Sequence, residues 1–288
     1  HFSFIDKFIQ KPKSLLNFIS LVKFIRYEKY DYYLNFSPNW FGVFLGVFSK
    51  SKIKSSLVFQ SRYKSKIFGK FWKVFFNKLF FSETIIVNRF KLLKQNKDIH
   101  QTKIMASLTL KTGIKVKDNT KLNFNFLNKF KLEKNKPLCI IHLSSKWINN
   151  YYSEEKFLEL LNSMIKKNIL IYLTSDQTSS SKFNEIFKKY PIADKSDILV
   201  KIKGKVIICE NFDFENWVSL INQADYVITP ECGCTHVASL TQCKLCVIYD
   251  SDNSPSSIMN EYAPWKKEYF ATETNDANLN TKLLNFIQ

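Results

Sequence analysis

One stretch in the second half of the chain reads Asp225-Tyr-Val-Ile-Thr-Pro-Glu-Cys-Gly-Cys-Thr-His236. Its first residues form an apolar run of strand length, and Pro230 and Gly233 are typical of a turn. The residues that follow predict a short helix at 235–241, and a second apolar run predicts a strand at 245–249. The stretch therefore predicts a strand–helix–strand unit, which is the repeating element of parallel α/β sheets.

Strands and helices alternate in the same way upstream of this unit. Short apolar runs predict the strands, and apolar residues at helical spacing predict the helices between them. The strands are expected at residues 137–143, 168–174 and 205–209, and the helices at 154–167, 182–190 and 214–223. This pattern predicts a doubly wound α/β fold, whose ligands bind at the carboxyl ends of the strands.

The first half of the chain shows a weaker version of the same pattern. Helices are predicted at 15–27, 42–49 and 100–113, and extended segments at 30–35 and 83–89. The segment 115–136 is rich in Lys and Asn, which is typical of a linker. We therefore expect two α/β domains, at residues 1–130 and 131–288, with the last helix packing back on the first domain.

Charge is distributed unevenly along the chain. Residues 1–136 hold 28 Lys/Arg and 7 Asp/Glu, a net charge of +21, whereas residues 137–288 carry a net charge of −3. The first half is therefore expected to attract a polyanion, either nucleic acid or an anionic lipid or lipopolysaccharide surface. The alternative is an ordinary solvated surface, because an A+T-rich coding bias accounts for much of the lysine content.

The sequence also indicates the cellular compartment in which the protein is expected. No window approaches the roughly 18 to 20 apolar residues that a membrane-spanning helix needs. The chain starts at His1 without a basic segment leading into an apolar one, so no signal peptide is predicted. Its six cysteines lie in a long chain rather than in a short disulfide framework, which favours a reducing cytoplasm.

The turn after the strand at 225–229 contains the strongest candidate binding residues. Gly233 allows a ligand to approach the backbone closely, and the N–H groups from Gly233 to His236 form an anion site suited to a phosphate. His236 could donate to a phosphate or ribose oxygen, and Glu231 could accept from a sugar or ribose hydroxyl. In the alternative interpretation, Glu231 and His236 only cap the helix.

This stretch resembles the signature of glycosyltransferase family 9, the heptosyltransferase-like enzymes of lipopolysaccharide core assembly. The family pattern is Asp-Thr-Gly-x-x-His, and here Gly233 and His236 match while Glu231 and Cys232 replace Asp and Thr. The segment from Ile141 to Phe157 is similar to the family's strand, lysine-bearing loop and helix start. Asn150 stands at the position of the family lysine, so the resemblance assigns its role to Lys146.

The resemblance implies the GT-B fold, with two Rossmann-like domains facing a central cleft and the nucleotide-sugar donor bound by the second domain. It implies an inverting direct displacement without metal or other cofactor, in which Lys146 stabilises the leaving group. The general base is expected on a βα unit ahead of His1, so no residue of this chain is assigned to that role. The implied donor-binding residues are Ser144, Ser145, Lys146, Glu210, Glu231, Cys232, Gly233, Cys234, Thr235 and His236, with Phe212 beside Glu210 at the nucleoside.

The resemblance also implies partners. The donor is a nucleotide-diphosphate sugar, of which ADP-linked heptose is the first candidate, and the acceptor is an anionic lipopolysaccharide or glycolipid. The enzyme is expected at the cytoplasmic face of the inner membrane, without a nucleic-acid partner. The aromatic side chains of Trp40, Phe41, Phe44 and Phe48 could contact the membrane, although we favour an ordinary core helix for them.

Three alternatives remain open at the level of sequence. A zinc ion could be bound by Cys232, Cys234, His236, Cys243 and Cys246. The basic half could bind nucleic acid, although three arginines in 288 residues supply little of the usual base recognition. The fold could also be retained in an inactive binding protein, because Glu231 and Cys232 depart from the family pattern.

Overall fold

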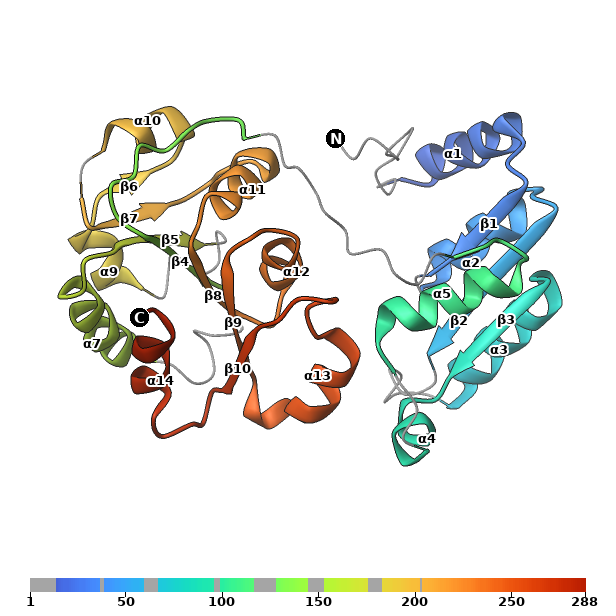
Figure 1. Cartoon of the computed structure of the whole chain (residues 1–288). Coiled ribbons are helices and arrows are strands. Elements are labelled where there is room, and N and C mark those ends of the chain that lie inside the picture. Colours follow the sequence, from blue (N-terminus) through green and yellow to red (C-terminus); the bar gives the residue numbers. More distant parts are fainter. Residues whose placement is uncertain are drawn as a thin grey trace. The chain divides into compact units, whose positions relative to one another are not determined.

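The computed structural model describes residues 14–36, 39–59, 67–95, 99–116, 128–144, 153–175, 183–202 and 204–288. The chain divides into two compact units, residues 1–118 and 119–288, and each has its own parallel sheet (Figure 1). This boundary lies earlier in the chain than residue 130, where the sequence analysis placed it. The α/β class with parallel sheets is confirmed in both units.

The first unit contains a three-stranded sheet with the order β1-β2-β3. Its strands are β1 (Tyr32–Asn35), β2 (Ile53–Phe59) and β3 (Glu83–Val87), and its helices are α1 (Leu15–Glu28), α2 (Trp40–Phe48), α3 (Ile67–Phe80), α4 (Arg89–Lys94) and α5 (Gln101–Lys111). The sequence analysis missed β2, α3 and α4. The interior of β2 contains two buried serines, Ser55 and Ser56, which interrupt the apolar run that marks a buried strand.

Helix α2 packs closely on β1 because its inner face carries two glycines. A Cβ at Gly42 would lie 2.5 Å from Asn35 Oδ1, and one at Gly46 would lie 2.5 Å from Tyr33 Cε1. The Tyr33 hydroxyl donates a 2.6 Å hydrogen bond to the Gly42 carbonyl. This close approach turns the side chains of Trp40, Phe44 and Phe48 toward the opposite face of the helix.

The second unit contains a seven-stranded parallel sheet with the order β10-β9-β8-β4-β5-β7-β6. The strands are β4 (Leu138–Leu143), β5 (Leu170–Ser175), β6 (Ile192–Ala193), β7 (Val206–Cys209), β8 (Tyr226–Pro230), β9 (Lys244–Tyr249) and β10 (Phe270–Glu273). The five strands that the sequence predicts are present. Two edge strands were missed: β6 has only two residues, and β10 follows the strand that the sequence analysis took as the last.

Helices cover both faces of this sheet (Figure 1). The core on one face joins the strands to α7 (Glu154–Ile165), α9 (Asn184–Lys189) and α14 (Leu279–Phe286). The core on the other face joins them to α10 (Ser196–Lys201), α11 (Phe214–Asn222) and α12 (Gly233–Ser239), with α13 (Pro255–Tyr262) packed at its margin. We call these the α7 face and the α11 face. Because both faces are covered, the central strands read as continuous apolar runs.

The last helix, α14, packs into the core of the second unit. Leu279, Leu283 and Ile287 are buried on the α7 face of the sheet. Lys167 Nζ donates a 2.6 Å hydrogen bond to the carbonyl of Leu284, and the Tyr226 hydroxyl donates to the carbonyl of Gln288 at 3.2 Å. These contacts place α14 on the second unit, and its expected packing on the first domain stays a prediction.

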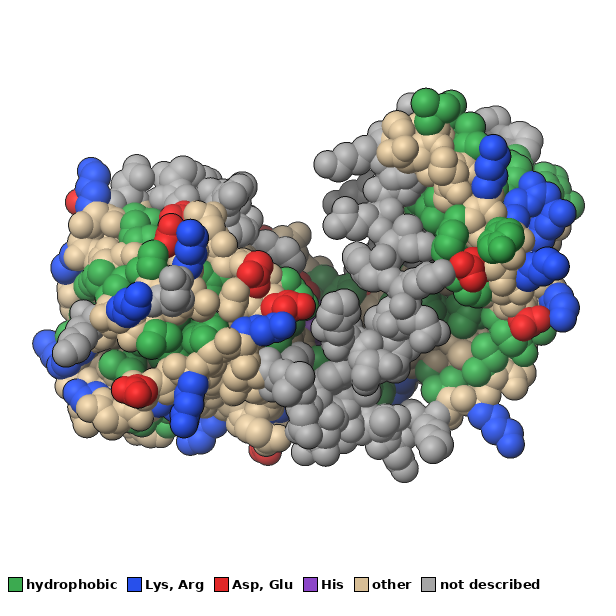
Figure 2. Space-filling view, turned by 90° about the horizontal axis from the view of Figure 1, so that it is seen from above, with side chains coloured by type: hydrophobic (Ala, Val, Ile, Leu, Met, Phe, Trp, Pro, Cys, Tyr) green, Lys and Arg blue, Asp and Glu red, His purple; other side chains and the backbone are tan. Residues whose placement is uncertain are grey.

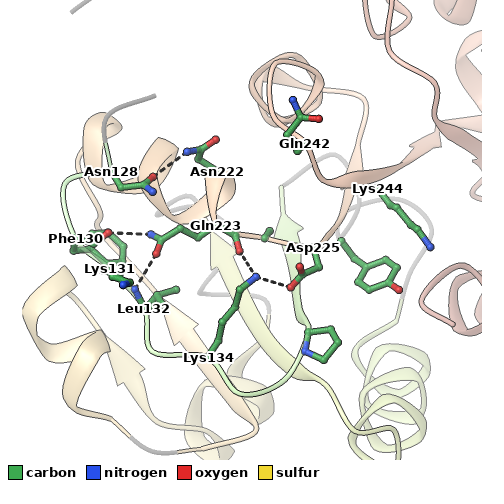
Figure 3. Close-up of a pocket in the computed structure, with 13 residues that line it drawn as sticks. Asn128, Phe130, Lys131, Leu132, Lys134, Asn222, Gln223, Asp225, Gln242 and Lys244 are labelled. Atoms are coloured by element: carbon green, nitrogen blue, oxygen red, sulfur yellow. Dashed lines mark hydrogen bonds and ion pairs between the residues drawn. The ribbon is translucent and has the colours of Figure 1, made fainter. Parts of the chain in front are cut away.

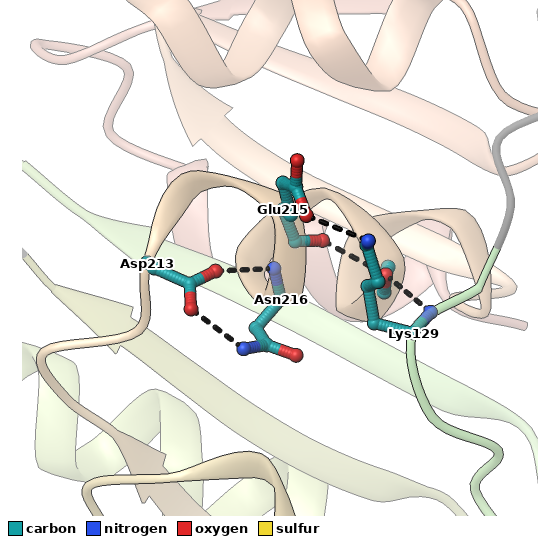
Figure 4. Close-up of polar contacts among 5 residues, drawn as sticks. Lys129, Asp213, Glu215 and Asn216 are labelled. Atoms are coloured by element: carbon teal, nitrogen blue, oxygen red, sulfur yellow. Dashed lines mark hydrogen bonds and ion pairs between the residues drawn. The ribbon is translucent and has the colours of Figure 1, made fainter. Parts of the chain in front are cut away.

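Residues 128–134, which the sequence analysis assigned to the linker, run along α11 (Figure 4). The backbone N–H of Lys129 donates to Ser219 Oγ at 2.9 Å, and Lys129 Nζ lies 2.8 Å from Glu215 Oε2. The amide oxygen of Gln223 accepts from the Leu132 N–H at 2.8 Å. This segment is therefore an integral part of the second unit. Among the described residues, no helix is both long enough and apolar enough to cross a membrane.

Candidate functional site

The strand order of the second unit defines where a ligand is expected. Chain order runs from β4 through β5 to β7 on one side, and then returns to β8 on the other side of β4. Strands β4 and β8 therefore pair at the point where the winding direction reverses. Doubly wound sheets bind their ligands at such a switch point, outside the carboxyl ends of the strands.

Two of the predicted donor-binding segments meet at this switch point. The printed register ends with Ile141 on β4 opposite Ile228 on β8. Ser144 and Glu231 are the first residues after the ends of these two paired strands. Ser144 is buried, whereas Glu231 is half-buried and its backbone N–H donates to the Ile248 carbonyl on β9 at 3.1 Å. Ser145 and Lys146, like Asn150, lie outside the described residues.

The turn from β8 into α12 is held by the side chain of Thr235. Its hydroxyl accepts from the Cys232 N–H at 3.3 Å and donates to the Pro230 carbonyl at 3.1 Å. The backbone N–H of Thr235 donates to the Cys232 carbonyl at 3.2 Å. Thr235 is therefore engaged within the turn through both its hydroxyl and its N–H group, which makes it a structural part of the predicted anion site.

Gly233 opens this turn to solvent. It is exposed, no atom of the described residues lies within 4 Å of the position that a Cβ would take, and its φ angle is outside the left-handed region. Neither backbone conformation nor packing against the described residues therefore requires glycine here. The open space lies beside the first N–H groups of α12, which by helix geometry have no partner one turn earlier. The close approach of a ligand to the backbone at Gly233 stays a prediction.

The two cysteines of the predicted site differ in position. Cys234 is buried in the core of the α11 face, so only its backbone can reach a ligand. Cys232 is half-buried at the N-cap of α12, and its Sγ atom lies 3.4 Å from the hydroxyl of Thr229. His236 is exposed one turn further along α12. The hydroxyl of Thr235 supplies two of the hydrogen bonds that hold the start of this helix.

Glu210 lies at the same edge of the sheet but further from the switch point. It follows β7, and its N–H donates to the Ala193 carbonyl at 3.0 Å. Three strand spacings of about 4.8 Å separate β7 from β8, so Glu210 starts about 14 Å from the β8 turn. Phe212, its predicted neighbour at the nucleoside, packs on Phe130, with ring centroids 6.4 Å apart.

Three aromatic residues near this edge were not nominated from the sequence. The ring of His142, at the end of β4, lies 5.8 Å from that of Trp217, and Phe214 lies 5.9 Å from Trp217. The Nδ1 atom of His142 is 2.9 Å from the hydroxyl of Thr174 on β5. A polar imidazole within the apolar run 138–143 was the available signal, since buried polar groups need partners.

The zinc site considered from the sequence, with ligands from Cys232, Cys234, His236, Cys243 and Cys246, is wrong. Cys246 is buried on the α7 face of the sheet, whereas Cys234 and Cys243 are buried on the α11 face. Burial raises the pKa of the Cys234 and Cys246 thiols, and thus disfavours the thiolate that binds zinc. Among the residues that the structure describes, no three His, Cys, Asp or Glu side chains are grouped to hold a metal.

A hollow of about 950 Å³ lies at the opposite, amino-terminal edge of the same sheet (Figure 3). It is bounded by the segment 128–134 and by the starts of β4, β8 and β9. Within it, Lys134 Nζ donates to Asp225 Oδ2 at 2.6 Å, and the Leu138 N–H donates to the same oxygen at 2.8 Å. Burial acts to raise the pKa of Asp225, but these hydrogen bonds outweigh it and lower the pKa. The hollow is remote from the β4–β8 switch point and contains none of the predicted site residues.

Comparison with known proteins gives a family match and several solved structures of similar fold. The model of glycosyltransferase family 9 (heptosyltransferase) matches residues 18–281. A family 9 glycosyl transferase from Veillonella parvula DSM 2008 is 14% identical, with a TM-score of 0.64 over 95% of this chain and 72% of that one. The E. coli heptosyltransferase WaaC is 12% identical, with a TM-score of 0.64 over 94% of this chain and 76% of that one. No curated protein sequence matches the chain.

A second E. coli enzyme, heptosyltransferase II, is also 12% identical, with a TM-score of 0.64 over 95% of this chain and 80% of that one. The strand order, the switch-point loops and these structural matches define a protein of the GT-B class. The chain belongs to glycosyltransferase family 9, the heptosyltransferase family. It is therefore a member of a family of sugar transferases, as its sequence motif predicts.

Proposed function

We propose that this protein transfers a heptose-like sugar from an ADP-linked donor to an anionic lipopolysaccharide core or a related envelope glycan. The observation that carries the proposal is the position of Ser144 and of the Glu231–His236 turn, which follow the paired strands β4 and β8 at the switch point of a family 9 fold. The similar WaaC structures are described with ADP and with ADP-2-deoxy-2-fluoro heptose. This supports ADP as the donor nucleotide.

The proposed reaction is a direct displacement with inversion, without metal or other cofactor. An acceptor hydroxyl attacks the anomeric carbon, and the bond to the diphosphate breaks, which leaves negative charge on the departing group. The first N–H groups of α12 and the side chain of Lys146 would stabilise that charge. Glu231 would accept from a hydroxyl of the sugar or ribose. No described residue is proposed as the general base.

Alanine at Glu231 or at His236 is expected to weaken ADP binding about tenfold. Each substitution removes a hydrogen bond to a charged or sugar oxygen, and such bonds contribute about 1.5–3 kcal/mol. Calorimetric titration of the chain with ADP, UDP, GDP and CMP measures the effect and identifies the nucleotide. Gln242→Ala, an exposed change at the opposite edge of the sheet, is the control and should leave the affinity unchanged.

Two outcomes of this titration would change the proposal. Unchanged ADP affinity in both alanine variants would remove Glu231 and His236 from the donor site. Saturable ADP binding without transfer from ADP-heptose to a lipopolysaccharide acceptor would favour the inactive binding protein. The family assignment favours a transferase over the nucleic-acid-binding alternative.

We also propose that the first unit contacts the cytoplasmic face of the inner membrane. Trp40, Phe44 and Phe48 follow one another at intervals of four residues, and they are 38%, 44% and 46% exposed. The core-helix interpretation is therefore wrong for these three side chains, although Val43 on the inner face is buried. Hydrophobic and basic side chains lie next to one another on this unit, on the right of Figure 2. Such a mixture suits an anionic lipid surface.

A triple variant, Trp40→Ala with Phe44→Ala and Phe48→Ala, is expected to bind vesicles containing anionic phospholipid at least fivefold more weakly than the parent chain. The aromatic rings would be lost from the interface, while the lysines would still attract the lipid head groups. Vesicle co-sedimentation at two salt concentrations measures both contributions. Phe270→Ala, an exposed aromatic of the second unit, is the control. Equal binding of the triple variant would contradict the proposed contact.

A further inference from the structure

Three aromatic rings form a continuous cluster at the carboxyl edge of the second sheet. His142 comes from the end of β4, and Phe214 and Trp217 come from the first turn of α11. Trp217 lies in the middle, 5.8 Å from the His142 ring and 5.9 Å from the Phe214 ring. Continuing the β4–β8 register by one residue places His142 beside Thr229, just before the turn that contains the candidate anion site.

The outer member of this cluster is open to solvent. Phe214 is 58% exposed, whereas Trp217 and His142 are half-buried. Phe212, two residues earlier, packs inward on Phe130. The loop after β7 therefore directs one phenylalanine into the protein and leaves the next one on the surface, on top of a second aromatic ring. An exposed aromatic surface supported by a rigid layer is suited to stacking a flat ligand.

The cluster is held in place by polar contacts on both of its elements. Asp213 caps α11: its Oδ1 accepts from the Asn216 N–H at 2.8 Å, and its Oδ2 accepts from Asn216 Nδ2 at 2.8 Å (Figure 4). On the strand side, Thr174 is buried and its hydroxyl is 2.9 Å from His142 Nδ1. These contacts fix the orientation of both ends of the aromatic surface before any ligand binds.

We propose that Phe214 and Trp217, with the His142 ring behind them, form the wall on which the base of the donor nucleotide stacks. The inference rests on the proposed function and extends it to the part of the site that selects the nucleotide. A base stacked here would lie at the same edge of the sheet as the half-buried carboxylate of Glu210, which follows β7, and the turn from β8 into α12. The carboxylate can accept a hydrogen bond from a ribose hydroxyl or an exocyclic amino group.

Phe214→Ala tests the wall by calorimetric titration of the full chain with ADP. The affinity is expected to fall about tenfold, because base–aromatic stacking contributes about 1–3 kcal/mol per base. Trp217→Phe keeps an aromatic ring and should retain the parent affinity within about threefold. Phe270→Ala is the matched control: Phe270 is another exposed phenylalanine of the same unit, stacked on Phe286, and lies at the start of β10.

Tryptophan fluorescence supplies a second readout. If Trp217 had only a structural role, ADP would not quench its emission. ADP should quench the tryptophan emission of the parent chain, and Trp217→Phe should remove that quenching while ADP still binds. Equal ADP affinity in the parent chain and in Phe214→Ala would show that the base does not stack on this wall. Identical quenching in the parent chain and in Trp217→Phe would show the same. Neither result would contradict the proposed ADP donor site. Absence of ADP binding by the folded parent chain would overturn the proposed ADP donor and the wall together.

Discussion

Valine in place of Gly233 is expected to abolish nucleotide binding while leaving the protein folded. A Cβ at this position meets no atom of the described residues within 4 Å, and the φ angle there is outside the left-handed region that favours glycine. The added methyl groups would occupy the space beside the first N–H groups of α12. Loss of two hydrogen bonds to a diphosphate, at about 1.5–3 kcal/mol each, predicts at least a ~100-fold lower ADP affinity.

Calorimetry with ADP and thermal unfolding of the same sample measure the two halves of this prediction. Gly46→Val is the matched control, because a Cβ at Gly46 would lie 2.5 Å from one aromatic ring and 2.6 Å from another. That control is expected to unfold at lower temperature because of overpacking in the first unit, whereas Gly233→Val should unfold at the parent temperature. Full ADP affinity in Gly233→Val would show that the diphosphate does not lie at this turn.

Leu283→Ala is expected to destabilise the second unit by about 3 kcal/mol. Leu283 is fully buried on α14, in the core that also contains Phe157 of α7 and Ile141 of β4. Removing its side chain leaves a cavity in this core, in which α14 contacts α7 and β10. The effect should therefore spread from α14 through the α7 face of the sheet to the strands that support the candidate site.

Hydrogen exchange followed by mass spectrometry separates the two units in this experiment. Peptides from β4, β5 and β8 should exchange faster in Leu283→Ala, while peptides from β1, β2 and β3 should keep the parent rates. Thr281→Ala, an exposed change on the same helix, is the control and should not alter exchange. Faster exchange confined to β1–β3 would instead mean that α14 supports the first unit.

The helix and strand pattern of the second unit was predictable because its signals are local. The apolar runs at β4, β5, β7, β8 and β9 are continuous, since covered parallel strands are apolar on both sides. Ser153 at the start of α7 accepts from the Lys156 N–H at 3.2 Å, as its N-cap prediction requires. The short edge strands β6 and β10 carry too few residues for such a signal.

The candidate site was only partly predictable. The Glu231–His236 turn is one continuous segment, so its glycine, its helix start and its family pattern are all visible in the sequence. Residues such as His142, Phe214 and Trp217 are more than 70 positions apart at the extremes, and each has an ordinary structural interpretation on its own. That they form one cluster is evident only from the contacts between β4 and α11.

By itself, the sequence determined the α/β class, the family and the turn that follows β8, because each depends on periodicity or on a short continuous motif. Tertiary structure alone decided that Ser144 and Glu231 follow two paired strands, that residues 128–134 and α14 belong to the second unit, and that Phe214 packs on Trp217 at the carboxyl edge of the sheet. The physical reason is strand order. Pairing β4 with β8, across 82 intervening residues, brings distant loops to one edge of the sheet, and no local pattern records which strands will pair.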